Sequence, residues 1–223
     1  TFKNCTFEGK NDHAEARGMQ IYGHYNITVE GYTFTTAKRY SLKYVGQDGY
    51  KATLKNNIVK NAANFVEIGS EPYKGTKYTI DFIDNTLYGA NLYREGYTNA
   101  ITTENVTINK SNNTTIIADG LTMVDDVYSI SNANGLFAFA ESSYSNKTIN
   151  IEADINLNNQ TWTSLDLKGT ITIEGNGHKI SGLTQPLIKG TGGIELTVKN
   201  MTIADSNIGI STNEGGLGTG AFI

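Results

Sequence analysis

The sequence predicts an all-β fold, a parallel β-helix in which the chain winds as a solenoid, and three observations lead to this prediction. A short phrase recurs at intervals of 20 to 29 residues. Stretches of four to six residues alternate or run apolar and stop at Gly or Asn, as short strands do. The composition is also unusual, because 28 Thr and 25 Asn make up close to a quarter of the 223 residues.

The recurring phrase is an apolar residue, a variable residue, Asn or Gly, two more residues and an apolar residue. Clear copies span 2–7, 29–34 and 54–59, weaker copies span 83–88 and 103–108, and the Asn or Gly anchors stand at 4, 31, 56, 85 and 105. A repeat of this length indicates a solenoid. Asn and Gly tolerate positive φ, so the anchors predict turns. When turns stack about 4.8 Å apart, equivalent Asn amides can form a ladder.

The expected strands include residues 18–23, 40–45 and 65–68. A helical repeat would need apolar spacings of three and four over ten or more residues, and the first 120 residues contain none. Thr suits such strands because a β-branched side chain packs well on a pleated surface. Each repeat is therefore expected to contain several short strands joined by turns.

After an interruption the phrase returns at 151–153, 173–175 and 198–200. Before this second set, one amphipathic helix is predicted near 132–142, with Ser131 or Asn132 as its N-cap and Leu136 on its apolar face. Such a helix suits the open end of a solenoid core, where strand edges would otherwise be exposed. We therefore expect two consecutive β-helical segments, 1–121 and 122–223, with a boundary near 121–127.

Composition and charge exclude several classes of protein. No run of about 18 apolar residues exists, so no membrane-spanning segment is predicted. The single Cys5 excludes an internal disulfide, and neither CxxC nor clustered His suggests a zinc site or another cofactor. Residues up to Lys110 contain 13 Lys and Arg against 11 Asp and Glu, whereas later residues contain 5 against 11. With no basic stripe, nucleic acid is not an expected partner.

The second half resembles a known family. Residues 128–140 (YSISNANGLFAFA), followed by 147–157 and Trp162, resemble the start of right-handed β-helix domains in surface proteins of gut bacteria. Residues 174–183 (EGNGHKISGL) are similar to the DGxGHxISGL turn of those proteins. Residues 198–208 (VKNMTIADSNI), with the ending GAFI, resemble the GLUG motif. The first 120 residues resemble only the broad pectate-lyase-like superfamily, through their periodicity.

This resemblance implies a right-handed parallel β-helix in both segments, export from a bacterium, attachment to the cell surface and, often, adhesion. It supplies no catalytic residues. The chain begins inside a repeat and ends where the GLUG-like motif normally continues, so both segments are expected to be truncated. His178 occupies a turn position of the family, where its imidazole can bond a neighbouring repeat.

The tyrosines give the main functional prediction. Of the 13 tyrosines, 11 precede residue 98, which is too many for the narrow interior of a β-helix. Several are expected on an outer face, where stacked phenol rings suit sugar rings or a protein partner. The predicted ligand-binding residues are Tyr22, Tyr44, Tyr73 and Tyr93. The alternative is that the rings pack on one another as structural ladders.

An enzyme is the second possibility, because polysaccharide lyases and glycoside hydrolases are built on β-helices. The candidate catalytic residues are Asp81, Asp84, Glu67 one repeat earlier, and Arg94. A lyase would use carboxylates to hold calcium, which bridges a uronate, and a base to remove a proton. Asp81 and Asp84 are three residues apart, however, and point to opposite faces of an extended strand. Solvated turn residues are therefore the favoured interpretation.

The leading hypothesis is an exported, non-enzymatic bacterial cell-surface protein for adhesion or for binding a carbohydrate or a host or bacterial surface protein. A polysaccharide lyase or glycosidase is the first alternative. A structural stalk that lifts other domains from the cell surface is the second.

Overall fold

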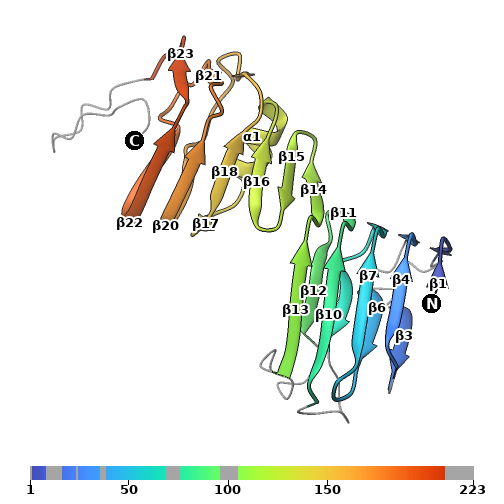
Figure 1. The fold of residues 1–223 in the computed structure, drawn as a ribbon. Helices are drawn as coiled ribbons and strands as arrows, with labels where there is room; N and C mark the ends of the chain where they lie inside the picture. Colours follow the sequence, from blue (N-terminus) through green and yellow to red (C-terminus); the bar gives the residue numbers. More distant parts are fainter. Residues whose placement is uncertain are drawn as a thin grey trace. The chain divides into compact units, whose positions relative to one another are not determined.

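The computed structural model describes residues 2–8, 17–23, 25–35, 39–68, 76–95 and 105–208. They form a parallel β-solenoid in which successive turns add strands to the same sheets (Figure 1). The chain divides into two compact units, 1–117 and 118–223. The division comes slightly before the predicted boundary, because Ala118 already packs against the hydrophobic core of the second unit.

The first unit contains three parallel stacks of strands, which we call sheets A, B and C. Sheet A consists of β1 (Phe2–Lys3), β4 (Ile27–Glu30), β7 (Lys51–Lys55), β10 (Tyr78–Ile83) and β13 (Val106–Ser111). The strands of sheet B are β2 (Thr6–Glu8), β5 (Thr33–Thr35), β8 (Ile58–Lys60), β11 (Thr86–Tyr88) and β14 (Thr114–Ala118). Sheet C consists of β3 (Arg17–Tyr22), β6 (Tyr40–Val45), β9 (Asn64–Ile68) and β12 (Asn91–Glu95).

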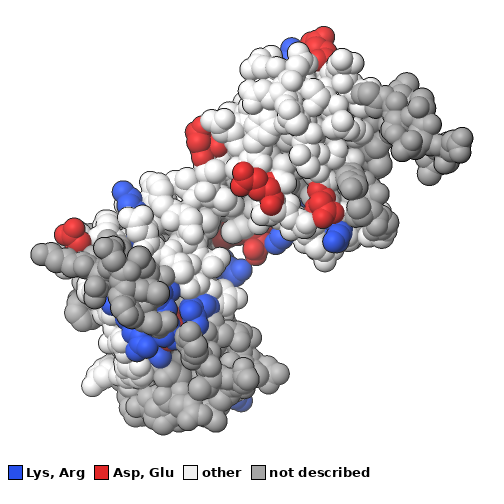
Figure 2. All heavy atoms as spheres, turned by 180° about the vertical axis from the view of Figure 1, so that it is seen from behind, with Lys and Arg blue, Asp and Glu red and all other residues white. Residues whose placement is uncertain are grey.

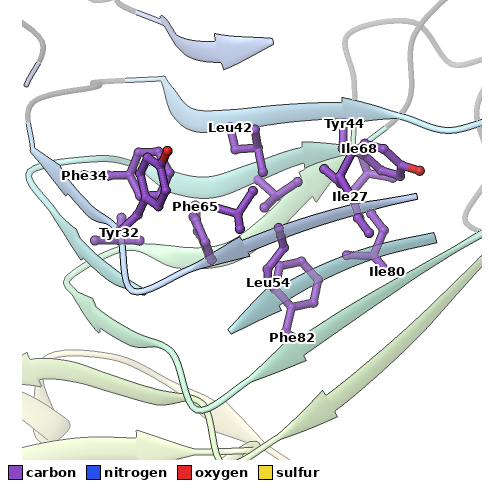
Figure 3. Packing of buried hydrophobic residues seen from close by; sticks show 14 of the residues in the cluster. Ile27, Tyr32, Phe34, Leu42, Tyr44, Leu54, Phe65, Ile68, Ile80 and Phe82 are labelled. Atoms are coloured by element: carbon purple, nitrogen blue, oxygen red, sulfur yellow. The ribbon is translucent and has the colours of Figure 1, made fainter. Parts of the chain in front are cut away.

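Alternation along the strands builds the core of the first unit. On β10, Tyr78, Ile80 and Phe82 are buried, and the residues between them are partly exposed. Figure 3 shows apolar side chains from successive strands meeting inside the solenoid. The ring of Phe65 lies 5.6 Å from that of Phe34 and 6.1 Å from that of Phe82, measured between centroids. Burying each such ring stabilises the unit by about 1.5–3 kcal/mol.

The turn that follows each strand of sheet A contains a residue with positive φ. These residues are Asn4, Gly31, Asn56, Asp84 and Asn112, with φ values of 52°, 71°, 53°, 53° and 56°. The predicted anchors at 4, 31 and 56 are confirmed. Asn85 also lies in its turn, between β10 and β11, but one residue after the position with positive φ. The anchor at 105 is wrong. Tyr78 pairs with Val106, so Asn105 precedes a strand and Asn112 is the residue that follows it.

The predicted asparagine ladder forms one position further along, inside the core. Asn57 Nδ2 donates to Asn85 Oδ1 at 2.9 Å, and Asn85 Nδ2 donates to Asn113 Oδ1 at 2.8 Å. Each Nδ2 also donates to a backbone carbonyl, that of Val29 for Asn57 and that of Leu54 for Asn85. Asn57 and Asn85 are fully buried, so these bonds satisfy polar groups that water cannot reach.

The second unit begins with an antiparallel pair, β15 (Leu121–Val124) and β16 (Val127–Ile130). Parallel strands then stack on β16 as β18 (Thr148–Ile151), β20 (Leu165–Glu174) and β22 (Ile188–Lys199), and β17 (Tyr144–Ser145) also pairs with β20. A small sheet contains β19 (Ile155–Asn156), β21 (Lys179–Ser181) and β23 (Thr202–Ala204). Gly175 is required at its turn, because an added Cβ would lie 2.4 Å from the carbonyl oxygen of Asn200.

The predicted helix is present as α1 (Ala133–Ala140), with Asn132 as its N-cap. The Asn132 side chain accepts a hydrogen bond from the backbone N–H of Gly135 at 2.8 Å. Leu136 and Phe139 are buried in the second core, and Phe139 stacks on Tyr144 with a centroid distance of 4.0 Å. Among the described residues, no helix has the length and apolarity needed to cross a membrane.

Candidate ligand-binding face

Four polar side chains occupy one register position of sheet C, on the side away from the core. Gln20 on β3 pairs with Lys43 on β6, Lys43 pairs with Glu67 on β9, and Glu67 pairs with Arg94 on β12. We call these four residues the sheet C ladder. Their neighbours Val66 and Ile68 point into the core, which fixes the ladder on the opposite side. Consecutive turns thus align Gln20, Lys43, Glu67 and Arg94 in one line.

Glu67 pairs with the basic side chains around it, and only 1% of its own side chain is exposed. Its Oε1 lies 3.1 Å from Lys43 Nζ, and its Oε2 lies 3.1 Å from Arg39 Nε and 3.5 Å from Arg94 Nε. A buried carboxylate is costly unless it is paired and hydrogen-bonded. Three cations meet that requirement, Arg39 and Lys43 from the turn before Glu67 and Arg94 from the turn after it, so the basic side chains are held in defined places.

Tyr22 lies beside the ladder, two residues beyond Gln20 on the same side of β3. Its side chain is 40% exposed. Its hydroxyl donates to Gln20 Oε1 at 3.2 Å, and Lys43 Nζ lies 5.8 Å from the centroid of its ring. The cation and the ring attract one another. A partly exposed aromatic ring is therefore held next to charged hydrogen-bonding groups.

Basic side chains gather on one part of the first unit. Figure 2 views the molecule from behind Figure 1, which is the side on which β3, β6 and β12 lie, and Lys and Arg side chains cluster there. Side-chain exposure is 9% for Arg39, 12% for Lys43 and 31% for Arg94. This face, formed by the sheet C ladder, Arg39 and Tyr22, is the candidate site.

The structure places the other predicted tyrosines differently. Tyr44 is fully buried in the core, so the prediction that it lines an outer face is wrong. It shares the inward side of β6 with Leu42, and its hydroxyl donates to the carbonyl of Tyr25 at 3.2 Å. Burial raises the pKa of Tyr44 to about 12. Its neighbour Leu42 was the sequence signal for this inward position.

Of the remaining two, Tyr93 is partly buried and packs against the core, where its ring stacks on that of Phe82 at 6.1 Å. Tyr73 lies outside the described residues. Tyr22 is thus the one member of the predicted set that the described structure places at the surface. Tyr25 and Tyr88, which were not in that set, are 65% and 43% exposed.

The four candidate catalytic residues do not share one face. Glu67 and Arg94 lie together on sheet C, whereas Asp81 lies on sheet A. Asp81 is paired with Lys51 and accepts a hydrogen bond from Asn109 Nδ2 at 2.8 Å. Burial raises the pKa of Asp81, but the hydrogen bonds from Lys51 and Asn109 and the charge of Lys51 outweigh it, so this pKa is lowered.

Asp84 has a structural place in a turn. It occupies a position with φ of 53°, and its Oδ1 accepts a hydrogen bond from Asn112 Nδ2 at 3.3 Å in the equivalent turn. Its interpretation as a turn residue is confirmed. The described residues contain no group of three or more His, Cys, Asp or Glu side chains arranged to hold a metal ion.

The second unit has a hollow of about 280 Å³ beside the turn that contains His178. Asp154, Lys179 and Asp205 line it. His178 Nδ1 lies 3.2 Å from Asp154 Oδ1, which confirms that this imidazole contacts a neighbouring turn. Hydrogen bonds from the backbone of Lys179 and from His178 lower the pKa of Asp154. The hollow has no exposed aromatic side chain in its lining, unlike the candidate face on sheet C.

Gln20, Lys43 and Arg39 were not predicted as site residues. The signal that would have found the ladder is its spacing, since positions 20, 43, 67 and 94 are separated by 23, 24 and 27 residues, close to the length of the repeat. Comparison of the chain with known protein families, with curated proteins and with solved structures finds no match.

Proposed function

We propose that this chain is a non-enzymatic part of an exported bacterial surface protein and that it binds a glycan through the candidate face on sheet C. The observation that carries the proposal is the position of Tyr22, whose partly exposed ring is held beside the sheet C ladder. Export and cell attachment are supported by the resemblance of residues 128–223 to surface proteins of gut bacteria.

The chemistry of this face suits a sugar. The apolar face of a sugar ring can stack on a phenol ring, and its hydroxyl groups can bond the amide of Gln20 and the charged groups of Lys43 and Arg94. The four strands place these groups in a line about 14 Å long. Because Glu67 fixes the cations before any ligand arrives, little side-chain entropy is lost on binding.

The alternatives receive less support. A lyase or hydrolase was expected to place Asp81, Asp84, Glu67 and Arg94 in one cleft, and the structure separates the two aspartates from the other pair. A stalk requires no aligned, partly exposed polar face, although the solenoid itself suits a spacer.

Binding to an array of glycans and mucins, followed by calorimetric titration of the strongest glycan, tests the proposal. The informative variant is Tyr22→Ala. Tyr88→Ala is its matched control, because Tyr88 is similarly exposed at 43% and has Lys60 Nζ 5.1 Å from its ring centroid, but lies on sheet B.

We expect Tyr22→Ala to weaken binding roughly tenfold, which corresponds to about 1.4 kcal/mol, and Tyr88→Ala to leave it unchanged. Equal loss in both variants, or loss only in Tyr88→Ala, would overturn the assignment to sheet C. Absence of binding to every glycan would overturn the proposed function and favour the stalk.

A further inference from the structure

We infer that the hollow beside β21 in the second unit is a second binding site, which takes one uncharged sugar residue through its hydroxyl groups. The site belongs to a different unit from the sheet C face and goes beyond the glycan binding proposed there. Several polar side chains that line the hollow take no part in holding the turns together, and these side chains carry the inference.

Three successive turns of the second unit line the hollow, within residues 154–159, within 179–182 and at Asp205. Ser181 and Gly182 are buried, whereas Asn158 and Asp205 are exposed. The turn with Asn158 closes directly on Gly182, because an added Cβ there would lie 2.9 Å from the backbone nitrogen of Asn158. The hollow therefore has a buried floor and an exposed rim.

The asparagines on the rim differ from those in comparable turns. Three asparagines with positive φ elsewhere in the second unit each form a side-chain hydrogen bond of 2.9–3.1 Å to a neighbouring turn, and these are Asn146, Asn176 and Asn200. Asn158 and Asn159 also have positive φ, of 52° and 54°, but within the described structure their side chains form no such bond. Their exposed amides are therefore available to a ligand.

The hollow also has a carboxylate and an ammonium group that the protein leaves unpaired. The backbone carbonyl of Asp205 accepts a hydrogen bond from the N–H of Gly182 at 3.1 Å, but the Asp205 side chain has no hydrogen bond or ion pair with a described residue. The Lys179 ammonium has none either, although its charge acts on Asp154 at longer range. The carboxylate accepts hydrogen bonds and the ammonium donates them.

These charges favour a ligand without a net charge. The carboxylates of Asp154 and Asp205 repel an anion, whereas the ammonium of Lys179 repels a cation. A sugar hydroxyl group can donate to a carboxylate and accept from an ammonium, so it suits both. Amide groups such as those of Asn158 and Asn159 also bond hydroxyl groups in both directions. A ligand rich in hydroxyl groups therefore fits this hollow.

The size of the hollow limits the ligand to one sugar residue, such as the end or a branch of a glycan. Its volume of about 280 Å³ is at the lower end of the range for small-molecule sites. No aromatic residue lines it, so hydrogen bonds alone hold the sugar. We expect a dissociation constant on the order of 1 mM.

Mapping of backbone amide shifts by NMR, during titration with galactose, glucose and mannose, tests this site. At least one of these sugars should shift the amides of Asn158, Ser181 and Gly182 in a saturable way. It should bind roughly fivefold more tightly than its own uronate and its own 2-amino sugar, because each of these adds a charge. Absence of saturable shifts at these amides with all three sugars would overturn the inference. Equal or tighter binding of a charged form would overturn it as well.

Asp205→Asn is the informative variant, because asparagine has nearly the same size and tolerates the φ of 45° at this position. It should weaken sugar binding about tenfold and leave the melting temperature unchanged, because only a charged hydrogen bond to the ligand is lost. Asp84→Asn makes the same substitution at a φ of 53° in the first unit and should leave binding unchanged.

Lys179→Gln gives a second test, which holds even if Asp205→Asn fails to fold. It should weaken binding several-fold, and Lys168→Gln, at an exposed position of the same unit that does not line the hollow, should not. Full affinity in Lys179→Gln and in every folded variant of Asp205 would overturn the inference. Tyr22→Ala should leave the shifts around the hollow unchanged, so the failure of one site is distinguishable from the failure of the other.

Discussion

Lys43 on β6 and Glu67 on β9 lie directly opposite one another on adjacent turns, with Lys43 Nζ 3.1 Å from Glu67 Oε1. This pair links the stability of the first unit to its proposed function. The same carboxylate that neutralises Lys43, Arg39 and Arg94 also fixes where their charged groups lie on the outer side of sheet C. Changes at Glu67 should therefore affect folding, whereas changes at Tyr22 should affect binding alone.

Glu67→Gln should destabilise the first unit, because it leaves Lys43, Arg39 and Arg94 close together without the carboxylate that they share. We expect a loss of about 3 kcal/mol in the free energy of unfolding, the low end of the range for a broken buried pair because Arg94 is partly exposed. Urea unfolding measures it. Glu30→Gln, which removes the carboxylate partner of the exposed Lys3, is the control and should change the midpoint little. A small effect of Glu67→Gln would show that the cluster is not buried as described.

Asn85→Ala should also lower stability, because it interrupts the asparagine ladder. It removes the side-chain partners of the Leu54 carbonyl and of the Asn57 backbone N–H, and each buried group left unsatisfied costs about 1–3 kcal/mol. Asn109→Ala, on the exposed side of β13, removes a bond to Asp81 and serves as the comparison. Thermal melting of both variants is the measurement, and Asn85→Ala should have the lower melting temperature. Equal melting temperatures would contradict the structural role of the ladder.

A substitution at Asn56 tests the positive-φ turns that follow the strands of sheet A. Its φ of 53° is unfavourable for a β-branched residue and natural for glycine. Asn56→Val should therefore destabilise the first unit by about 1 kcal/mol, and Asn56→Gly should stay within about 0.5 kcal/mol of wild type. Chemical denaturation of the two variants provides the measurement. Greater stability of the valine variant would rule out a left-handed backbone at this turn.

The burial of Tyr44 predicts that the first unit loses stability in alkali. Burial raises its pKa to about 12, above the value near 10 of an unfolded tyrosine. Above pH 10 the unfolded state therefore loses a proton that the folded state keeps, so this contribution is complete below pH 10 and is lost as the pH rises toward 12. Between pH 8 and pH 11 the contribution falls by about 1 kcal/mol.

Urea unfolding of wild type and Tyr44→Phe at pH 8 and at pH 11 isolates the contribution of Tyr44 to the free energy of unfolding. The variant should be less stable at pH 8, because the hydrogen bond to the Tyr25 carbonyl is lost, but its stability should fall less on going to pH 11. An identical pH dependence of the two proteins would mean that Tyr44 is not buried.

The solenoid was predictable because Asn and Gly recur at its turns. The preference of these residues for turns is a local property that needs no knowledge of distant contacts. The register was harder to predict. Asn85 satisfies the recurring phrase, yet the neighbouring Asp84 supplies the left-handed backbone and Asn85 supplies the buried amide. Only the pairing of Tyr78 with Val106 shows which turn residue is equivalent to which, and that pairing is a contact between distant parts of the sequence.

The candidate face was predicted only in part. Tyr22 was identified because tyrosines are abundant in the first half, but abundance does not reveal which side of a strand a ring occupies. Tyr44 lies inward because it alternates in phase with Leu42. Lys43 and Arg94 were not linked in the sequence, since they are 51 positions apart and meet only through the stacking of three turns around Glu67.

Mapping of backbone amide chemical shifts by NMR, during titration with the tightest-binding glycan of the array, tests the central claim most directly. Binding at sheet C predicts that the largest shifts fall on Gln20, Tyr22 and Lys43, and that residues 79–81 on sheet A and 58–60 on sheet B stay unchanged. Largest shifts on sheet A, on sheet B or in the second unit, with residues 20–22 and 43 unmoved, would contradict the assignment of the glycan to sheet C.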